Sequence, residues 1–470
     1  MHHVLLARYL VIASICFCFY LLSKRRSLLN YLACDSRPFT LPGLDIEGIN
    51  RLSSEYRTYP LQPPYNSQFW EAGKRLRSAT KWLYSLDSLN EKAPARHDLT
   101  SAIESVTVNL VPFLPARSGT PFQNLRSSFT RSKGIVIPVR GGHESIRFAG
   151  HLIRSLRMVL RSELPIQIAY AGEDDFSQRH RDVLSHLAPM ANVSFLNVLS
   201  YFDDFHLRLG KGQWAIKPYA ALASRFEQVI LLDVDSILLQ KPDSLLEHQA
   251  FRSHGAFLFY DRHNERKTAA VRHDLPRDGG GRQLPNIRMS RAQTPSYAEE
   301  LDSGVVVVDK GRPEVLMGLL HICWQNTYQV RSEVTFGISY QNKGSWWQGL
   351  ELTGSGYGYE KDPGVVIGWG SPCAAYGDRN LAPAHVDENG DLIWYSGGSL
   401  RSNLGRTQSF GLPEVWRISD RWIYGVTGQG PDCMTRASIK PLNQMEIRAL
   451  MLNMEAADYV DEILEGVEGL

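Results

Sequence analysis

The chain has 470 residues, a formal net charge of +2, 43% hydrophobic residues and 21% charged residues. These fractions are those of an ordinary globular protein, and the length predicts one large elaborated domain or one domain with appendages. The near-neutral charge and the dispersed basic residues give no sign of a nucleic-acid partner, so none is expected.

The only strongly apolar block lies near the N-terminus, where residues 9–22 read YLVIASICFCFYLL. With residues 4–7 it approaches the ~20 residues that span a bilayer, although Arg8 interrupts it. A cleaved signal peptide is the alternative, but the following SKRR is a poor cleavage site. An uncleaved signal anchor over residues 1–26 is therefore favoured. Its basic residues lie on the C-terminal side, so charge does not predict a lumenal orientation for the rest of the chain.

Residues 27–130 are predicted to be a stem and a helical appendage. Residues 27–65 carry several prolines and no sustained period, which suits an extended stem. From Gln68 to Ser105 large apolar residues recur at three- and four-residue steps, the pattern of a helix. Prolines between residues 112 and 121 then break the chain before the main domain.

The main domain opens with a predicted βαβ unit. A short apolar strand at 134–139 leads into the turn 140–143, a helix at 144–161 and a second strand at 164–170. Right-handed crossover makes the two strands parallel. The turn contains Gly141, Gly142 and His143, and it could let a nucleotide approach the backbone closely. It is not G-x-G-x-x-G, so this signal is weak alone.

The most informative stretch is 225–242, RFEQVILLDVDSILLQKP. Its unbroken apolar run, 229–232, predicts a strand buried on both faces. Asp233 and Asp235 follow, where two carboxylates are costly unless their charge is compensated, and oxygen ligands suit Mg²⁺ or Mn²⁺. The carboxyl ends of parallel strands bind ligands in α/β sheets. One interpretation is the metal–diphosphate site of a nucleotide-sugar glycosyltransferase. The other is a solvated strand-end turn, which Asp favours anyway.

Further strands and helices are predicted along the rest of the chain. They are a strand at 193–198, a helix at 214–226, strands at 256–260 and 305–309, and helices at 313–325, from 341 and at 445–464. Residues 263–298 are polar and aperiodic, as in a lid or acceptor-binding loop. Lys217, in the helix before the long apolar stretch, either reaches a phosphate or simply faces solvent.

Two further features leave alternatives open. His385 precedes the turn of a predicted strand–turn–strand at 385–395, and a lone histidine is more often structural than a metal ligand. Trp346 and Trp347 could stack on a sugar, but core packing explains them equally well. In a lumenal protein Cys373 and Cys433 are the preferred disulfide pair, and buried thiols are the alternative.

Taken in order, these signals resemble the fungal Golgi α-mannosyltransferase family that includes the α-1,3-mannosyltransferases. The matching blocks extend from about Lys133 to Gly398, and the block through Asp233 and Asp235 is the most specific of them. They are KGIVIPV with its Gly-Gly-His turn, LIRSLRMVL, LPIQIAYAGEDD, WAIKPYAALASRFEQVILLDVDSILLQKP, FLFYDR, LDSGVVVVDK, SWWQGLEL and HVDENGDLIWY.

The resemblance implies an α/β fold of the GT-A type, a Rossmann-like mixed sheet flanked by helices, over residues 131–436, with a C-terminal helix at 437–470. It implies a single-pass type II Golgi membrane protein with a lumenal catalytic domain. GDP-mannose would be the donor, a mannosylated glycan the acceptor and Mn²⁺ the cofactor.

The resemblance also assigns site residues. Metal ligation falls to Asp233, Asp235 and, as a third ligand, His385. Asp302 is the candidate catalytic carboxylate of a retaining transfer, with turn hydrogen bonding as its alternative role. The remaining expected donor contacts are Gly141, Gly142 and His143 beside the guanosine, Lys217 at the phosphates or sugar, Asp302 and Ser303 on mannose hydroxyls, and Asp261 and Arg262 bordering the same pocket.

One departure from the family pattern concerns specificity. The family typically reads Gly-Asp-Lys-Glu where this chain has Gln341-Asn342-Lys343-Gly344, so both acids are absent. Three interpretations stay open: an active mannosyltransferase, the same fold using another nucleotide sugar such as a UDP-sugar, and a non-catalytic Golgi scaffold that binds glycan. The intact Asp233 and Asp235 argue against the last.

Overall fold

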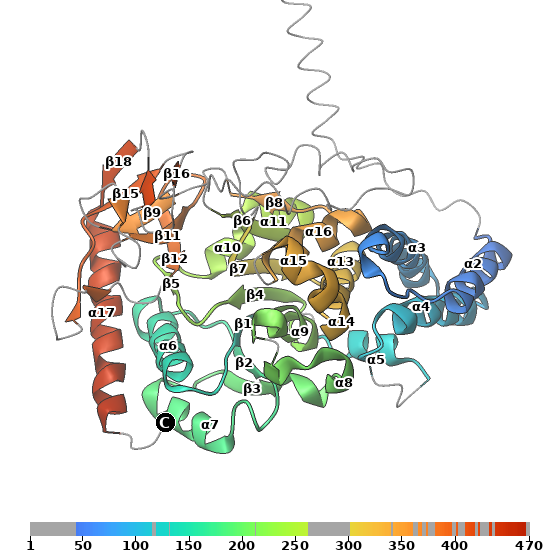
Figure 1. The fold of residues 1–470 in the computed structure, drawn as a ribbon, viewed down its shortest axis with the longest axis horizontal. Coiled ribbons are helices and arrows are strands. Elements are labelled where there is room, and N and C mark those ends of the chain that lie inside the picture. Colours follow the sequence, from blue (N-terminus) through green and yellow to red (C-terminus); the bar gives the residue numbers. More distant parts are fainter. Residues whose placement is uncertain are drawn as a thin grey trace, which may run out of the picture. The chain divides into compact units, whose positions relative to one another are not determined.

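The fold is built on a seven-stranded sheet, which the computed structural model places between helices (Figure 1). The strand order is β3-β2-β1-β4-β7-β6-β8, so four parallel strands are extended by the antiparallel strand β7. The strands are β1 (Lys133–Pro138), β2 (Ile166–Tyr170), β3 (Val193–Asn197), β4 (Gln228–Leu232), β6 (Ala256–Tyr260), β7 (Leu301–Asp309) and β8 (Gly358–Tyr359). The predicted mixed α/β architecture, with parallel β1 and β2, is confirmed.

The structure describes residues 44–114, 119–130, 132–211, 213–261, 301–339, 342–360, 365–368, 373–374, 381–396, 401–402, 409–418, 422–423, 432–434 and 438–466. The predicted anchor at 1–26, the predicted loop at 263–298 and Arg262 lie outside these ranges. Within them, no helix combines the length and the apolar character needed to cross a membrane.

A second, six-stranded antiparallel sheet was not predicted. Its order is β18-β15-β9-β11-β12-β5. Its strands are β5 (Ser236–Leu238), β9 (Val365–Gly368), β11 (Leu381–Val386), β12 (Leu392–Ser396), β15 (Val415–Ile418) and β18 (Ser438–Pro441). Because β4 ends at Leu232 and β5 begins at Ser236, the short segment Asp233-Val234-Asp235 links the two sheets directly.

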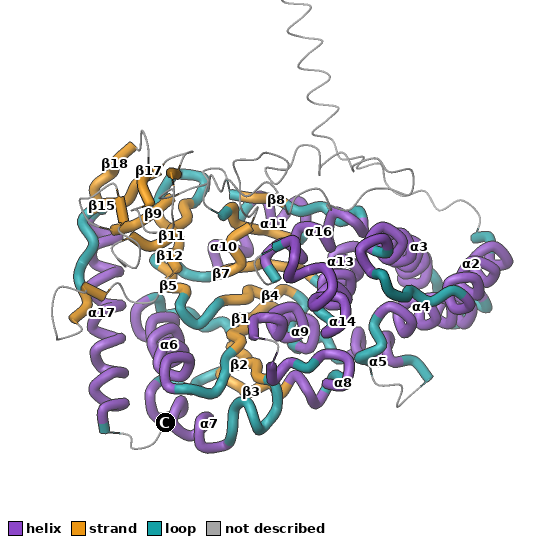
Figure 2. The backbone as a smooth tube through the Cα atoms, viewed as in Figure 1, coloured by secondary structure: helices purple, strands orange, loops and turns teal. Residues whose placement is uncertain are grey.

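Helices cover both faces of the large sheet (Figure 2). The helix α6 (His143–Arg154) shares one core with Ile135 and Ile137 of β1 and with Val460 of α17 (Gln444–Glu465). Val136 points the other way and is also buried, because side chains alternate along a strand. That second face is covered by α9 (Ile216–Ala223), α13 (Pro313–Gln325) and α16 (Lys343–Thr353).

The region before the large sheet differs from the prediction. The expected extended stem contains the helix α2 (Ile46–Thr58), and the expected helix at 68–105 is two helices, α3 (Phe69–Ser88) and α4 (Ala95–Leu110). The chain turns between α3 and α4 before Pro94, which precedes α4. The helix α2 was missed because its apolar residues are few, and it is held by packing on α4 instead.

The predicted C-terminal helix is confirmed as α17, which runs beside α6 in Figure 1. A capping box starts it: Asn443 accepts from the Met445 and Glu446 amides, and Glu446 accepts from the Asn443 amide. Arg147 and His151 of α6 both bond Asp461 of α17.

Candidate functional site

A cavity of about 230 Å³ opens where β4 and β6 end and β7 begins. Since β7 runs antiparallel to β4, the first residues of β7 lie beside the last of β4, and the Asp233 amide donates to Gly304 O at 2.8 Å. The lining residues that concern the chemistry are Trp214, Lys217, Asp233, Asp235, Asp261, Asp302, Ser303, Asn342 and Lys343. Six of the predicted site residues are therefore brought together here.

The predicted residues of the glycine turn, Gly141, Gly142 and His143, do not line this cavity. Gly141 borders a neighbouring cavity of about 780 Å³ beside Gly172 and Asp175, which follow β2. A Cβ atom at Gly141 would lie 2.1 Å from Asp175 O, so only glycine fits this turn. Gly142 has φ +126° and precedes His143, the first residue of α6. The predicted guanosine-binding role of these residues stays a prediction.

Lys217 is buried in the cavity wall rather than extended into solvent, with 2% of its surface exposed. Its Nζ donates to Asp233 Oδ2 at 2.6 Å and to the backbone and side-chain oxygens of Ser303 at 3.1 Å each. The ammonium thus already has three acceptors within the protein. A role at a donor phosphate would require Lys217 to exchange at least one of them.

Asp233 is held at an electrostatic cost. Burial has the largest effect and raises the pKa of Asp233. The Lys217 ammonium lowers the pKa and the Asp235 carboxylate raises it, and the net result is a pKa of about 7. The second oxygen, Asp233 Oδ1, is buried and has no hydrogen-bond partner among the described residues. A buried carboxylate oxygen without a donor is the state that a cation would relieve.

The pKa of Asp302 is shifted in the opposite direction from that of Asp233, although Asp302 is also buried. Burial alone would raise the pKa of Asp302, but Lys343 and His385 outweigh it, so the pKa lies well below the usual range. Asp302 Oδ1 also accepts from the Gly304 amide at 2.9 Å. This carboxylate is therefore ionised at neutral pH and fixed in direction.

His385 lies behind Asp302, on β11, between two acids. Its Nδ1 is 2.7 Å from Glu360 Oε1, and its Nε2 is 3.5 Å from Asp302 Oδ2. Burial lowers the pKa of His385, but Glu360 and Asp302 more than offset this and raise it to about 9. Glu360 was not predicted. It follows β8 with no motif around it, and only the folded structure brings it to His385.

A divalent cation is bound best by carboxylate oxygens that lack other donors, and the cavity offers one. Among the described residues, Lys217, Lys343 and His385 are cationic side chains that face carboxylates at or behind the cavity, which are Asp233, Asp235, Asp261, Asp302 and Glu360. Asp233 Oδ1 has no hydrogen-bond partner among the described residues. This oxygen, with the nearby Asp235 carboxylate, fits a cation held by Asp233 and Asp235.

A third protein ligand is not evident in this arrangement. Within the part of the chain that the structure describes, no group of three or more His, Cys, Asp or Glu side chains has the geometry to hold a metal ion. Both ring nitrogens of His385 face carboxylates. Ligation by His385 therefore stays a prediction from resemblance.

Of the two residues that stand where acids were expected from the resemblance, Asn342 lines the cavity, beside Lys343, and Gly344 does not. Asn342 is buried, and its Nδ2 donates to Trp214 O at 2.6 Å. Lys343 Nζ is 2.6 Å from Asp261 Oδ2. Trp346 and Trp347 are 0% and 2% exposed, so they pack in the core, and neither presents a face to a sugar in this structure.

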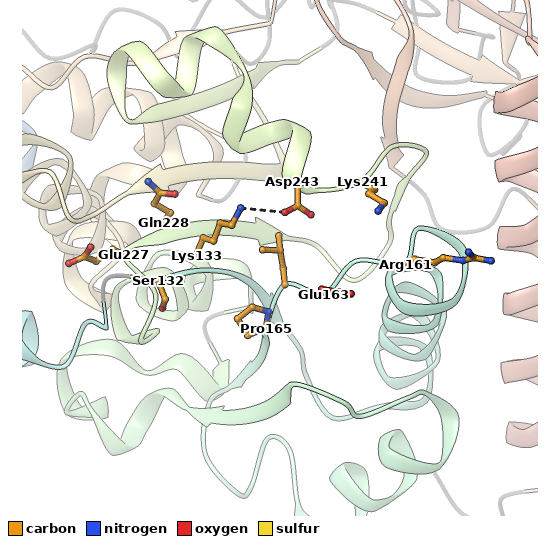
Figure 3. Close-up of a pocket in the computed structure, with 10 residues that line it drawn as sticks. Ser132, Lys133, Arg161, Glu163, Pro165, Glu227, Gln228, Lys241 and Asp243 are labelled. Atoms are coloured by element: carbon orange, nitrogen blue, oxygen red, sulfur yellow. Dashed lines mark hydrogen bonds and ion pairs between the residues drawn. The ribbon is translucent and has the colours of Figure 1, made fainter.

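A larger cavity, of about 990 Å³, lies at the opposite end of the strands, where β1, β2 and β4 begin (Figure 3). Gln228 begins β4 and Lys133 begins β1 there, and Lys133 pairs with Asp243 at 3.5 Å. The lysine side chain is 49% exposed, so this pair is solvated. Of the predicted site residues that the structure describes, none lines this cavity.

Comparisons with known proteins point to one kind of enzyme. A family model described as "Mannosyltransferase putative" matches residues 132–387, which include the whole cavity except Ser396. "Putative alpha-1,3-mannosyltransferase MNN14" of Candida albicans is 23% identical over 325 residues, covering 60% of this chain and 45% of the relative. "Alpha-1,2-mannosyltransferase MNN22" of the same fungus is 26% identical over 243 residues, covering 45% and 38%. The chain thus spans under half the length of these relatives.

Among solved structures, the galactosyltransferase LgtC with donor and acceptor sugar analogs overlaps 48% of this chain and 73% of its own. The sequences are 12% identical and the TM-score is 0.32. We draw no conclusion from an overlap at this level.

Proposed function

The chain belongs to the family described as "Mannosyltransferase putative", and from this premise we propose that it transfers mannose from GDP-mannose to a mannosylated glycan, with retention and an α-1,3 linkage. The acceptor would be a protein N- or O-glycan or cell-wall mannan. The observation that carries the proposal is the pair Asp233 and Asp235, which follow β4 and line the cavity, where Asp233 Oδ1 has no hydrogen-bond partner among the described residues.

In this proposal Asp233 and Asp235 would hold Mn²⁺, and the donor diphosphate would bind beside them. A bound Mn²⁺ would supply Lewis-acid neutralisation of the charge that develops on the departing diphosphate. Lys217 fixes the direction of the Asp233 carboxylate through its 2.6 Å hydrogen bond. Asp261, held by Lys343, and Ser303 would bind sugar hydroxyls at the cavity wall.

Asp302 is the proposed catalytic carboxylate. Its depressed pKa keeps it ionised, as required of a group that meets positive charge at the sugar carbon. An ionised Asp302 could attack the sugar carbon and form a covalent intermediate. It could instead stabilise positive charge on the sugar while the acceptor attacks from the face that the leaving group vacates. Both routes belong to the proposal, because an anionic oxygen at this position serves each.

The proposed setting is a GT-A enzyme anchored by residues 9–22 with its catalytic part in the Golgi lumen. In the small three-stranded sheet, Cys373 of β10 (Cys373–Ala374) and Cys433 of β17 (Asp432–Met434) are register partners. This register agrees with the predicted disulfide, and an oxidising lumen would permit the bond.

A second candidate is the same chemistry with another nucleotide sugar, such as a UDP-sugar. Asn342 favours it, because an amide stands at the cavity where the family pattern has an acid. A non-catalytic glycan-binding scaffold is the third candidate, and the intact pair Asp233 and Asp235 speaks against it.

The test is turnover by the full chain, purified in detergent, against a panel of GDP- and UDP-sugars with and without Mn²⁺. We expect metal-dependent hydrolysis and transfer of GDP-mannose, lost in Asp235→Ala. Asp243→Ala, which removes a carboxylate at the opposite end of the strands, is the matched control and should keep wild-type turnover. Metal-dependent use of another donor would support the second candidate, and no turnover of any donor would support the scaffold.

A further inference from the structure

A buried chain of three ionisable groups leads away from the cavity. It runs from Asp302 of β7 through His385 of β11 to Glu360, which directly follows β8. The three side chains are almost wholly enclosed, with 6%, 3% and 3% of their surfaces exposed. They come from segments far apart in the sequence, so the folded structure alone assembles them.

The imidazole in the middle is held in one orientation. Trp394 stacks on it with ring centres 4.2 Å apart and planes at 21°, and Phe259 meets it edge-on at 5.1 Å. Glu360 is fixed in turn, because its Oε1 accepts the Tyr260 amide at 3.1 Å as well as facing His385 Nδ1. With Nδ1 directed at Glu360, Nε2 faces Asp302 Oδ2 at 3.5 Å and has no hydrogen-bond partner among the described residues.

Among the described residues, the hydrogen-bond partners of Glu360 are the Tyr260 amide and His385. Its second oxygen, Oε2, is buried without a partner in the described parts of the chain, and burying a carboxylate in this way is costly. An uncharged side chain could pack in its place at lower cost. The charge is explained if it orients the ring, as carboxylates do behind histidines in metal and hydrolase sites.

We propose that Glu360 is a positioning residue for Asp302 and that it acts through the His385 imidazole, so that His385 serves this carboxylate instead of a metal ion. The inference rests on the proposed function, in which Asp302 meets the reacting sugar. The 3.5 Å separation of His385 Nε2 and Asp302 Oδ2 is an ion pair longer than a hydrogen bond. Contacts of this kind commonly tighten when substrate binds.

The kinetic test is Glu360→Gln, which keeps the size and an acceptor oxygen but removes the charge. We expect kcat to fall about 10- to 100-fold, while the KM for GDP-mannose changes less than about twofold, because only the reacting geometry is disturbed. Glu104→Gln is the matched control. Glu104 is another buried glutamate that accepts two backbone amides, those of Phe122 and Gln123, and it lies outside both cavities. An unchanged kcat in Glu360→Gln would overturn the proposal.

A structural test separates this inference from the proposed function. In crystals of the full chain soaked with MnCl₂, we expect His385 Nε2 to stay on Asp302 and away from the ion. A ring nitrogen about 2.2 Å from manganese would overturn the proposal, since that is a ligand distance. In crystals of Glu360→Gln, the ring and the Asp302 carboxylate should be displaced, and unmoved groups would also overturn it. Absence of turnover in the wild type would refute the proposed function and leave these two outcomes decisive for the contact itself.

Discussion

Lys217 Nζ lies 2.6 Å from Asp233 Oδ2, so the carboxylate proposed to hold a metal ion is also the partner of a buried ammonium. The ammonium occupies Oδ2 and leaves Oδ1 without a hydrogen-bond partner among the described residues. Lys217 and the proposed divalent cation would therefore both act on the Asp233 carboxylate.

Replacing Lys217 with Met should destabilise the protein markedly. The change removes one member of a buried ion pair and leaves Asp233 uncompensated, which costs about 3 kcal/mol in comparable cases. The free energy of unfolding in urea measures the loss. MnCl₂ should restore part of it, and so should the double variant Lys217→Met/Asp233→Asn. Lys133→Met, which breaks a solvated pair at 3.5 Å, is the control and should cost under about 1 kcal/mol. Equal losses in Lys217→Met and Lys133→Met would contradict this account.

Asn342→Asp should lower the free energy of unfolding of the metal-free protein by about 1–3 kcal/mol. An ionised Asp cannot donate to Trp214 O, and it adds a carboxylate to a cavity already lined by Asp233, Asp235, Asp261 and Asp302. Divalent cation should reduce this loss, whereas the loss caused by Asn342→Ala should not depend on the cation. Thermal unfolding with MnCl₂ and with EDTA distinguishes the two variants. If both respond equally to the cation, charge at position 342 is not the cause.

Position 344 has no room for the acidic side chain that was expected there from the resemblance. A Cβ atom would lie 2.8 Å from both Cβ and Oγ of Ser339, and that hydroxyl accepts the Gly344 amide at 2.7 Å. Gly344→Ala should therefore destabilise the protein by about 1–3 kcal/mol. Ser339→Gly should relieve the contact, so the double variant should unfold at a higher urea concentration than an additive sum predicts. Additive losses would show that the clash is not the cause. A Gly344→Glu variant would for this reason lose stability as well as change the site, so its activity alone would not measure specificity.

The attachment of α17 should weaken in acid. Burial would raise the pKa of Asp461, but hydrogen bonds from His151 and Arg147 outweigh it, so the pKa is well below the ordinary value. A depressed pKa stabilises the fold above the unfolded pKa, about 3.9, and this stability is lost as the pH falls further. Asp461→Asn should cost about 2 kcal/mol at pH 7 and progressively less below pH 4.

Hydrogen exchange of the α17 amides would locate that loss. Protection should fall first in the turn of α17 that contacts Arg147 and His151. Asp458→Asn is the control on the same helix, because burial and then the nearby Asp461 raise the pKa of Asp458, so its charge gives no stability to lose. A pH-independent loss in Asp461→Asn would point to packing instead of charge.

Sequence patterns predicted the parallel strands β1, β2 and β4 because each is a short apolar run next to glycine or aspartate, a signal that is local. Of the second sheet, the predicted strand–turn–strand at 385–395 is confirmed by the antiparallel pairing of β11 with β12. The rest was missed because its strands are short and widely spaced. The six cavity residues were predicted by resemblance and motif. Glu360 was not, since only long-range pairing brings it to His385. Lys217 was expected at a phosphate, and nothing in its neighbourhood along the chain indicates that its acceptors are Asp233 and Ser303.

The segment Asp233-Val234-Asp235 is a covalent crossing between the two sheets, and the contact of Asp302 with His385 is a second crossing, from β7 to β11. The cavity thus lies where the two sheets meet, with Asp302 on β7 of one sheet and His385 on β11 of the other. The sheets are packed together, because Leu232 of β4 and Trp394 of β12 belong to one hydrophobic core. A ligand bound by Asp233 and Asp235 would therefore be held by the segment of chain that joins the two sheets, at a place where neither sheet can move without the other.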